Sequence, residues 1–97
     1  MAETLSIVIP AYNEEQRLPP SLDRIFTYAP RCPIPIQEIL VVDDGSRDGT
    51  AGMIEAGVRS GKYPGLLRVI RNPGNRGKGY AVRNGMAPAT GSWALST

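Results

Sequence analysis

Two adjacent carboxylates, Asp43 and Asp44, directly follow the apolar run at residues 39–42. Neighbouring side chains at the end of a strand point to opposite sides of a sheet, so such a pair usually has two different tasks. One carboxylate can accept hydrogen bonds from a nucleobase or a ribose, while the other supports the loop or a metal ion. The alternative is that both only solvate a turn, because Asp-Gly is a common turn sequence. The apolar run in front of the pair favours the functional interpretation.

A second group of polar side chains, Tyr12, Asn13 and Glu14, follows another apolar run at residues 5–9. Tyrosine has a ring face on which a nucleobase can stack, and asparagine and glutamate can bond the edge of a base or the hydroxyls of a ribose. The alternative is an ordinary loop that leads into a helix, with asparagine as the turn former. The similar position of the Asp pair favours a shared site.

Residues 75–79, Asn-Arg-Gly-Lys-Gly, stand in front of a helix-like stretch. Amides at a helix N-terminus, glycines that allow close approach and two cations form a suitable phosphate site. The spacing excludes a P-loop, because Asn72 stands at the first glycine position and Gly79 follows the lysine. A dinucleotide fingerprint is excluded because residues 10–15 contain no glycine. The alternative here is a surface loop with solvated charges.

Apolar runs alternate with helix-like stretches, as in the βαβ units of a parallel sheet. We predict strands at 5–10, 38–42, 66–70 and from 92 onward, and helices at 18–29, between a cap at Ser46 or Asp48 and a stop at Gly61, and at about 79–87. Pro19 and Pro20 suit the first turn of the first helix. The fold class is therefore α/β, a Rossmann-like, mainly parallel sheet with flanking helices. The carboxyl ends of its strands should form one rim, where open α/β sheets bind ligands.

Composition narrows the function classes. The 97 residues suffice for one small domain, residues 1–97, and the formal net charge of +2 is too small to argue for nucleic acid. The absence of histidine excludes histidine metal ligands and a His-based triad in this chain, and the single cysteine excludes an intramolecular disulfide. Five basic residues of the last third suggest a local anion site: Arg68, Arg71, Arg76, Lys78 and Arg83.

Targeting signals are not evident. The sequence has neither a signal peptide pattern nor an apolar stretch near the ~20 residues of a membrane span. We therefore expect a cytoplasmic location. The cytoplasmic face of a membrane stays open as an alternative for the full-length protein.

Taken together, these segments resemble the N-terminal half of the family-2 glycosyltransferases, which have the GT-A fold. The matching segments, with their spacing, are residues 8–15, 41–50 and 75–79. Residues 77–86 are most similar to the dolichyl-phosphate glucosyltransferase branch, with dolichyl-phosphate mannose synthases next.

The resemblance implies a nucleotide-sugar donor, UDP-glucose or GDP-mannose. It implies that Pro10, Ala11, Tyr12 and Glu14 line the nucleoside pocket, that Asp44 bonds the base and that the 77–79 loop lies near the pyrophosphate. Together with the analysis of the Asp pair, this gives the predicted donor-binding residues Pro10, Ala11, Tyr12, Glu14, Asp43, Asp44, Gly77, Lys78 and Gly79.

The resemblance also implies Mg²⁺ or Mn²⁺, held against the donor pyrophosphate by an Asp-x-Asp motif after the fourth strand, beyond Thr97. We therefore expect this chain to be a partial GT-A domain that is inactive alone, with no catalytic or metal-binding residue of its own. An exposed sheet edge could support self-association.

The expected full-length enzyme transfers a hexose, glucose from UDP-glucose, to a polyprenyl (dolichyl-type) phosphate with inversion. Two alternatives stay open. One is a family-2 enzyme with another acceptor, a polysaccharide or a protein glycan, and the other is a non-catalytic nucleotide-binding module.

Overall fold

The computed structural model describes residues 3–72 and 93–96 of the chain. The predicted third helix and the predicted phosphate loop, with Gly77, Lys78 and Gly79, lie outside the described residues. The described elements, in chain order, are β1 (Leu5–Ala11), α1 (Leu18–Tyr28), the 3₁₀ helix η1 (Ala29–Arg31), β2 (Ile36–Asp43), α2 (Thr50–Ser60), β3 (Leu67–Arg71) and β4 (Trp93–Ser96).

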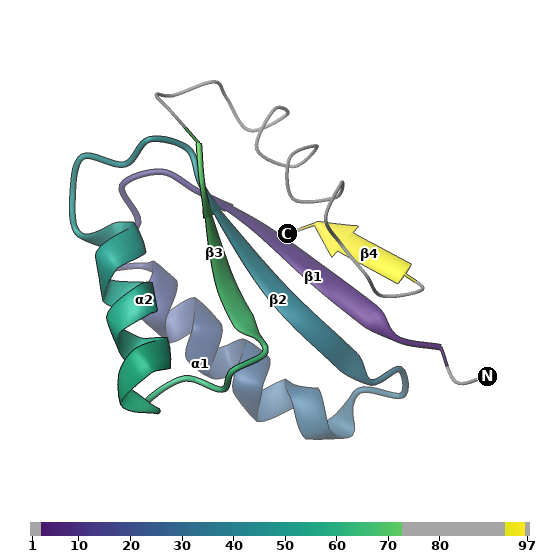
Figure 1. Ribbon diagram of the computed structural model, residues 1–97. Coiled ribbons are helices and arrows are strands. Elements are labelled where there is room, and N and C mark those ends of the chain that lie inside the picture. The colour runs from purple at the N-terminus through teal and green to yellow at the C-terminus, as the bar shows by residue number, and fades with distance from the viewer. Residues whose placement is uncertain (1–2, 73–92, 97) are drawn as a thin grey trace.

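The described strands form one parallel sheet in the order β3-β2-β1-β4 (Figure 1). This confirms the predicted α/β class. The predicted strands were placed correctly, but β2 begins two residues earlier than expected and β3 is shifted by one residue. Such shifts at element ends are normal, because terminal residues satisfy the hydrogen-bond pattern only in part.

Both faces of the central strands are buried, as their continuous apolar runs predicted. Ile7 and Ile39 belong to a core cluster that includes residues of both α1 and α2, so these helices cover the same face (Figure 1). Val8 and Leu40, one residue further along each strand, belong to a second cluster on the opposite face. The two-residue period of a strand explains this division. The carboxyl ends of β1 and β2 are therefore supported by packing on both faces of the sheet.

The start of α1 agrees with its prolines, and the start of α2 does not agree with the predicted cap. Proline occupies the first turn of α1, where no amide donor is required. The N-cap of α2 is Gly49, not Ser46 or Asp48. Asp48 lies one residue earlier, and its Oδ1 still accepts the Thr50 amide at 2.9 Å. The carboxylate thus satisfies a helix amide from outside the cap position. At its other end α2 stops as predicted, at Gly61 with φ +83°.

Candidate functional site

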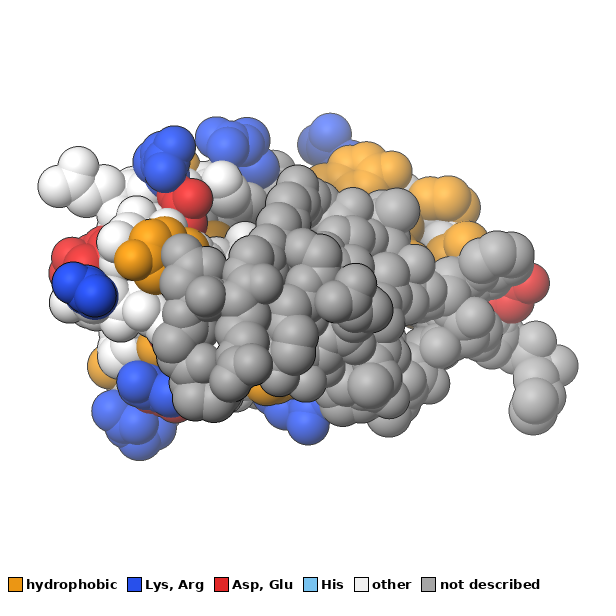
Figure 2. Space-filling view, turned by 90° about the horizontal axis from the view of Figure 1, so that it is seen from above, with side chains coloured by type: hydrophobic (Ala, Val, Ile, Leu, Met, Phe, Trp, Pro, Cys, Tyr) orange, Lys and Arg blue, Asp and Glu red, His pale blue; other side chains and the backbone are white. Residues whose placement is uncertain are grey.

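The ends of β1, β2 and β3 meet in one row. Ala11 pairs with Asp43, and Asp43 pairs with Arg71 on its other side. Just beyond the row, the Asp44 amide donates to the Ala11 carbonyl at 2.9 Å and the Asn72 amide donates to the Asp43 carbonyl at 2.8 Å. We call the carboxyl ends of these strands, with the loops at 12–17 and 44–50, the rim. In the view onto this end of the sheet, charged side chains of both signs lie at the margin of the molecule (Figure 2).

The two carboxylates of the Asp pair have different partners, as their alternation predicted. Oδ1 of Asp43 accepts the Ser46 amide at 3.3 Å and also the Ser46 hydroxyl. Oδ1 of Asp44 accepts Nδ2 of Asn72 at 3.4 Å. Both aspartates are only 4% exposed. Asp43 therefore supports its own loop, and Asp44 is held toward β3.

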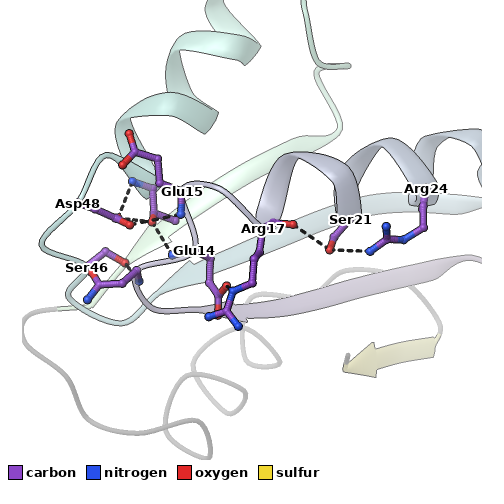
Figure 3. A network of polar contacts seen from close by, with 9 residues as sticks. Glu14, Glu15, Arg17, Ser21, Arg24, Ser46 and Asp48 are labelled. Carbon is purple, nitrogen blue, oxygen red and sulfur yellow. Dashed lines mark hydrogen bonds and ion pairs between the residues drawn. The ribbon is translucent and has the colours of Figure 1, made fainter.

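The 12–15 segment is bonded to the β2–α2 loop through its backbone. Three consecutive amides donate to side-chain oxygens of that loop: Asn13 N to Ser46 Oγ (2.9 Å), Glu14 N to Thr50 Oγ1 (2.9 Å) and Glu15 N to Asp48 Oδ2 (3.3 Å). We call these three contacts the amide clamp; part of it is drawn in Figure 3. Asn13 has φ +53°, a conformation that asparagine tolerates better than most residues, and its Oδ1 accepts the Arg47 amide at 2.9 Å. The clamp fixes the segment that carries Tyr12.

The side chains of Tyr12 and Glu14, both on the 12–15 segment, have different surroundings. Tyr12 is 37% exposed and, with Tyr28, is one of the exposed large apolar side chains among the described residues. The Glu14 carboxylate pairs with Nε of Arg17 at 2.8 Å. The carbonyl of Arg17 accepts the Ser21 hydroxyl, which in turn accepts the Arg24 guanidinium, so a polar chain runs from the rim along α1 (Figure 3).

Hydrogen bonds, two of them between charged groups, shift three pKa values at and near the rim. The Thr50 hydroxyl, helped by the Thr50 and Glu15 amides, lowers the pKa of Asp48. The hydrogen bond from Arg71 lowers the pKa of Glu55 on α2, and the same bond raises the pKa of Arg71, with a smaller contribution from Asp43. These shifts favour the charged forms of all three groups.

Two of the five basic residues of the predicted anion site, Arg68 and Arg71, lie among the described residues. Arg68 pairs with Glu38 at 3.8 Å, and Arg71 pairs with Glu55, so both arginines already have acidic partners. The other three basic residues of the prediction lie outside the described residues.

A groove of about 720 Å³ runs between α1 and β1 rather than over the Asp pair. Its walls include apolar side chains such as Leu5, Ile7 and Ile25, and Pro10 and Glu14 lie at its lining as well. The structure therefore separates the predicted site residues into two groups. Ala11, Tyr12, Asp43 and Asp44 lie at or next to the strand ends, and Pro10 borders the groove. Glu14 belongs to both, because it lies in the rim loop and also lines the groove.

Within residues 3–72 and 93–96, no three His, Cys, Asp or Glu side chains come together in a way that could hold a metal ion. No helix among these residues has the length and apolar character needed to cross a membrane.

Sequence reasoning missed three residues that organise the rim. The sequence pattern uses Asn72 only to exclude a P-loop, but Asn72 is buried and bonded to Asp44. Ser46 was considered only as a helix cap, and Thr50 was not considered. The available signal was the density of hydroxyl and carboxyl side chains at 43–50, which exceeds what one helix cap requires.

Comparison with known proteins identifies the family. The family described as "Glycosyl transferase family 2" has a sequence model that matches residues 6–96 of this chain. The chain belongs to this family. That match covers the rim, both sheet faces and β4, and it confirms the predicted resemblance.

Relatives of this chain are named dolichyl-phosphate beta-glucosyltransferase. The protein of that name from Drosophila melanogaster is 42% identical over 91 residues, covering 90% of this chain and 28% of the relative. The protein from Homo sapiens is 42% identical over 96 residues, covering 94% of this chain and 29% of the relative. The chain thus spans less than a third of the length of these curated relatives.

Solved structures of related glycosyltransferases share the fold. A mannosyltransferase from Pyrobaculum calidifontis in complex with GDP-Man and Mn²⁺ has a TM-score of 0.74 at 27% identity, covering 94% of this chain and 26% of that one. A glucosyl-3-phosphoglycerate synthase from Mycobacterium tuberculosis in complex with Mn²⁺, UDP and glucosyl-3-phosphoglycerate has a TM-score of 0.67 at 27% identity, covering 97% and 33%. The fold of this chain is therefore that of GT-A glycosyltransferases.

Proposed function

We propose that this chain supplies the donor-nucleoside end of a glycosyltransferase that transfers glucose from UDP-glucose to a polyprenyl (dolichyl-type) phosphate, with inversion. The observation that carries the proposal is the meeting of Tyr12 and the Asp pair at one rim, in a chain 42% identical to dolichyl-phosphate beta-glucosyltransferases. Ligands of open α/β sheets bind at this end of the strands.

The assigned roles follow from the chemistry of each side chain. The exposed ring of Tyr12 stacks on the base, and the carboxylate of Asp44 accepts a hydrogen bond from it. Asp43, bonded to Ser46, holds the loop that presents Asp44. Ala11 brings backbone close to the nucleoside, because its side chain is small. The pyrophosphate then lies toward Lys78, which remains a prediction from the sequence.

The proposed transfer needs little acid–base chemistry. A phosphate oxygen of the acceptor forms a bond to the anomeric carbon of glucose, and the bond from that carbon to the diphosphate breaks, releasing UDP. A phosphate monoester has a second pKa of about 6, so the acceptor is largely ionised at neutral pH and hardly requires a base. The protein has to align the reactants and stabilise the departing diphosphate.

The proposed enzyme uses a divalent metal ion, but the described residues of this chain do not supply its ligands. The two related structures contain Mn²⁺. The described residues provide no matching group of ligands, so no step is assigned to a metal here. In a longer protein we place Mg²⁺ or Mn²⁺ on an Asp-x-Asp pair that follows the fourth strand, where it would neutralise the leaving diphosphate.

A second candidate is a family-2 enzyme with a small soluble acceptor. It is favoured by the likeness to the glucosyl-3-phosphoglycerate synthase, whose structure contains UDP and glucosyl-3-phosphoglycerate. The donor site is the same in both candidates, so the acceptor alone separates them. For the polyprenyl-phosphate enzyme we propose the cytoplasm, at the cytoplasmic face of a membrane.

We further propose that copies of this chain associate through the sheet edge, weakly at low salt and more strongly when salt screens the charges on that edge. β3 forms one edge of the described sheet, and its exposed residues include Arg68 and Arg71. Charged side chains on an edge strand oppose pairing between copies. Sedimentation of the 97-residue chain should show a larger associated fraction in high salt than in low salt. An associated fraction that does not change with salt would contradict a role for these charges.

Calorimetry on the 97-residue chain tests the donor site. UDP and UDP-glucose should bind more tightly than GDP-mannose, and UDP should bind without Mn²⁺ because the nucleoside contacts need no metal. A preference for GDP-mannose would replace the glucosyl assignment by a mannosyl one. A folded sample that binds none of the three ligands would refute the donor site.

A further inference from the structure

The Thr50 hydroxyl links a backbone amide of the rim to a carboxylate. It accepts the Glu14 amide at 2.9 Å and donates to Oδ1 of Asp48, and Thr50 is fully buried. A hydroxyl has one proton and two acceptor sites, so donation to the carboxylate leaves a lone pair for the amide. The bond to a charged acceptor is the stronger of the two and fixes the orientation of the hydroxyl. The position of Glu14 is thereby tied to the first residue of α2.

The Ser46 hydroxyl repeats this arrangement one residue earlier in the rim segment. It accepts the Asn13 amide at 2.9 Å and donates to Oδ1 of Asp43. Asp43 is a member of the Asp pair and is only 4% exposed. The segment beside Tyr12 is thus connected through one hydroxyl to the carboxylate that precedes Asp44.

Helix capping does not account for these contacts. The start of α2 already has the bond from the Thr50 amide to Asp48 at 2.9 Å and the bond from the Met53 amide to the Gly49 carbonyl at 2.9 Å. The clamp bonds instead reach residues that are 33 to 36 positions away in the sequence. Their effect falls on the 12–15 segment, not on the helix.

We propose that Ser46 and Thr50 are positioning residues of the nucleoside site, a role that rests on the proposed donor-binding function. They act through the 12–15 segment, whose amides their hydroxyls accept, and not through a contact with the nucleotide. They hold Tyr12 and Glu14 at a fixed place relative to Asp44 before the nucleotide arrives. A loop that is already ordered loses less conformational entropy on binding, and this preserves affinity.

The test compares uridine and UDP binding, by calorimetry, in the 97-residue chain and in Thr50→Val, which removes the hydroxyl at nearly constant volume. Both ligands should bind about fivefold to tenfold more weakly, and by the same factor, because the clamp acts on the nucleoside end. Thr50→Ser keeps the hydroxyl and should restore affinity. Thr27→Val is the matched control, because the Thr27 hydroxyl donates to a carbonyl within α1, outside both loops.

The hydrogen-exchange rate of the Glu14 amide measures, without any ligand, how well the bond to Thr50 protects this amide. Exchange should be faster in Thr50→Val and normal in Thr50→Ser. Faster exchange with unchanged affinity for both ligands would overturn the positioning role and leave the donor site intact. If Thr50→Val does not fold, Ser46→Ala at the partly exposed Ser46 gives the same comparison through the Asn13 amide. A folded wild-type chain that binds neither ligand would instead refute the proposed function, and the positioning role with it.

Discussion

The rim and the α1 groove share β1 as a wall but are built from different chemistry. At the rim, successive backbone amides of the 12–15 segment find side-chain oxygens, and the Asp pair is buried and bonded. In the groove, apolar side chains border about 720 Å³ of open space, with Arg17 and Arg24 among the few charged residues of the lining. The rim is ordered by directional bonds, which suits a ligand that is read by its polar edge. The groove belongs to the sheet face on which α1 and α2 pack, which we call the helix side. This side contributes apolar packing, so it and the rim should respond differently to substitution.

The largest effect on binding is expected at the rim, from Asp44→Ala. Loss of a carboxylate that bonds the base should weaken UDP binding about tenfold to hundredfold, since hydrogen bonds to charged groups contribute about 1.5–3 kcal/mol. Asp23→Ala is the matched control, because Asp23 is exposed on α1 and lies outside both rim loops. Calorimetry with UDP measures both variants. Equal affinities for the two would contradict the role given to Asp44 and would blur the distinction between rim and helix side.

On the helix side, two glycines of α2 separate packing from binding. A Cβ at Gly57 would lie 2.3 Å from Cδ2 of the buried Tyr63 ring, whereas nothing lies within 4 Å of a Cβ at Gly52. Gly57→Ala should therefore destabilise the fold by about 1–3 kcal/mol through overpacking. Gly52→Ala should stabilise it by about 0.5–1 kcal/mol through helix propensity.

Urea unfolding measures both glycine variants, and UDP calorimetry provides the contrast with Asp44→Ala. Neither glycine variant should change the affinity of the folded chain, because the clamp bonds α2 through Thr50 and not through either glycine. Changes in stability of the same sign for both would contradict the packing of Tyr63 against Gly57.

The sheet and the rim could be predicted from the sequence because their signals are local. Continuous apolar runs bounded by turn residues gave β1 and β2, and the prolines at 19 and 20 gave the start of α1. The end of α2 at Gly61 followed from the tolerance of glycine for positive φ. The Asp pair and Tyr12 could then be placed at one rim, because the carboxyl ends of parallel strands lie together.

The contacts within the rim could not be predicted, because they join residues far apart in the sequence. The clamp depends on how the two loops face each other, which follows from the sheet register and from the left-handed conformation of Asn13. The same applies to the bond between Asn72 and Asp44, which spans 28 positions. The predicted N-cap of α2 was wrong for a related reason. The Asp48 carboxylate accepts amides from both loops, those of Glu15 and Thr50, and Gly49 occupies the N-cap position.

The smallest expected effect is a pH dependence of stability through Asp48. Bonds from Thr50 and Glu15 lower the pKa of this carboxyl in the folded chain below its unfolded value, which is about 3.9. The unfolded state therefore binds more protons in this range, and stability rises with pH. The contribution of Asp48 is fully present above about pH 4 and is lost as the pH falls through the lowered pKa.

Urea unfolding between about pH 5 and about pH 3 measures this contribution in wild type and in Asp48→Asn. The variant should lose stability less steeply than wild type on acidification, because its side chain cannot be protonated in this range. Asp23→Asn, at an exposed position of α1 outside both loops, is the control for the substitution itself. Parallel slopes for wild type and Asp48→Asn would show that the carboxylate form of Asp48 does not hold the two loops together. The contacts between the two loops would then rest on Ser46, Thr50 and Asn13, and Asp48→Asn should leave the exchange of the Glu14 amide unchanged.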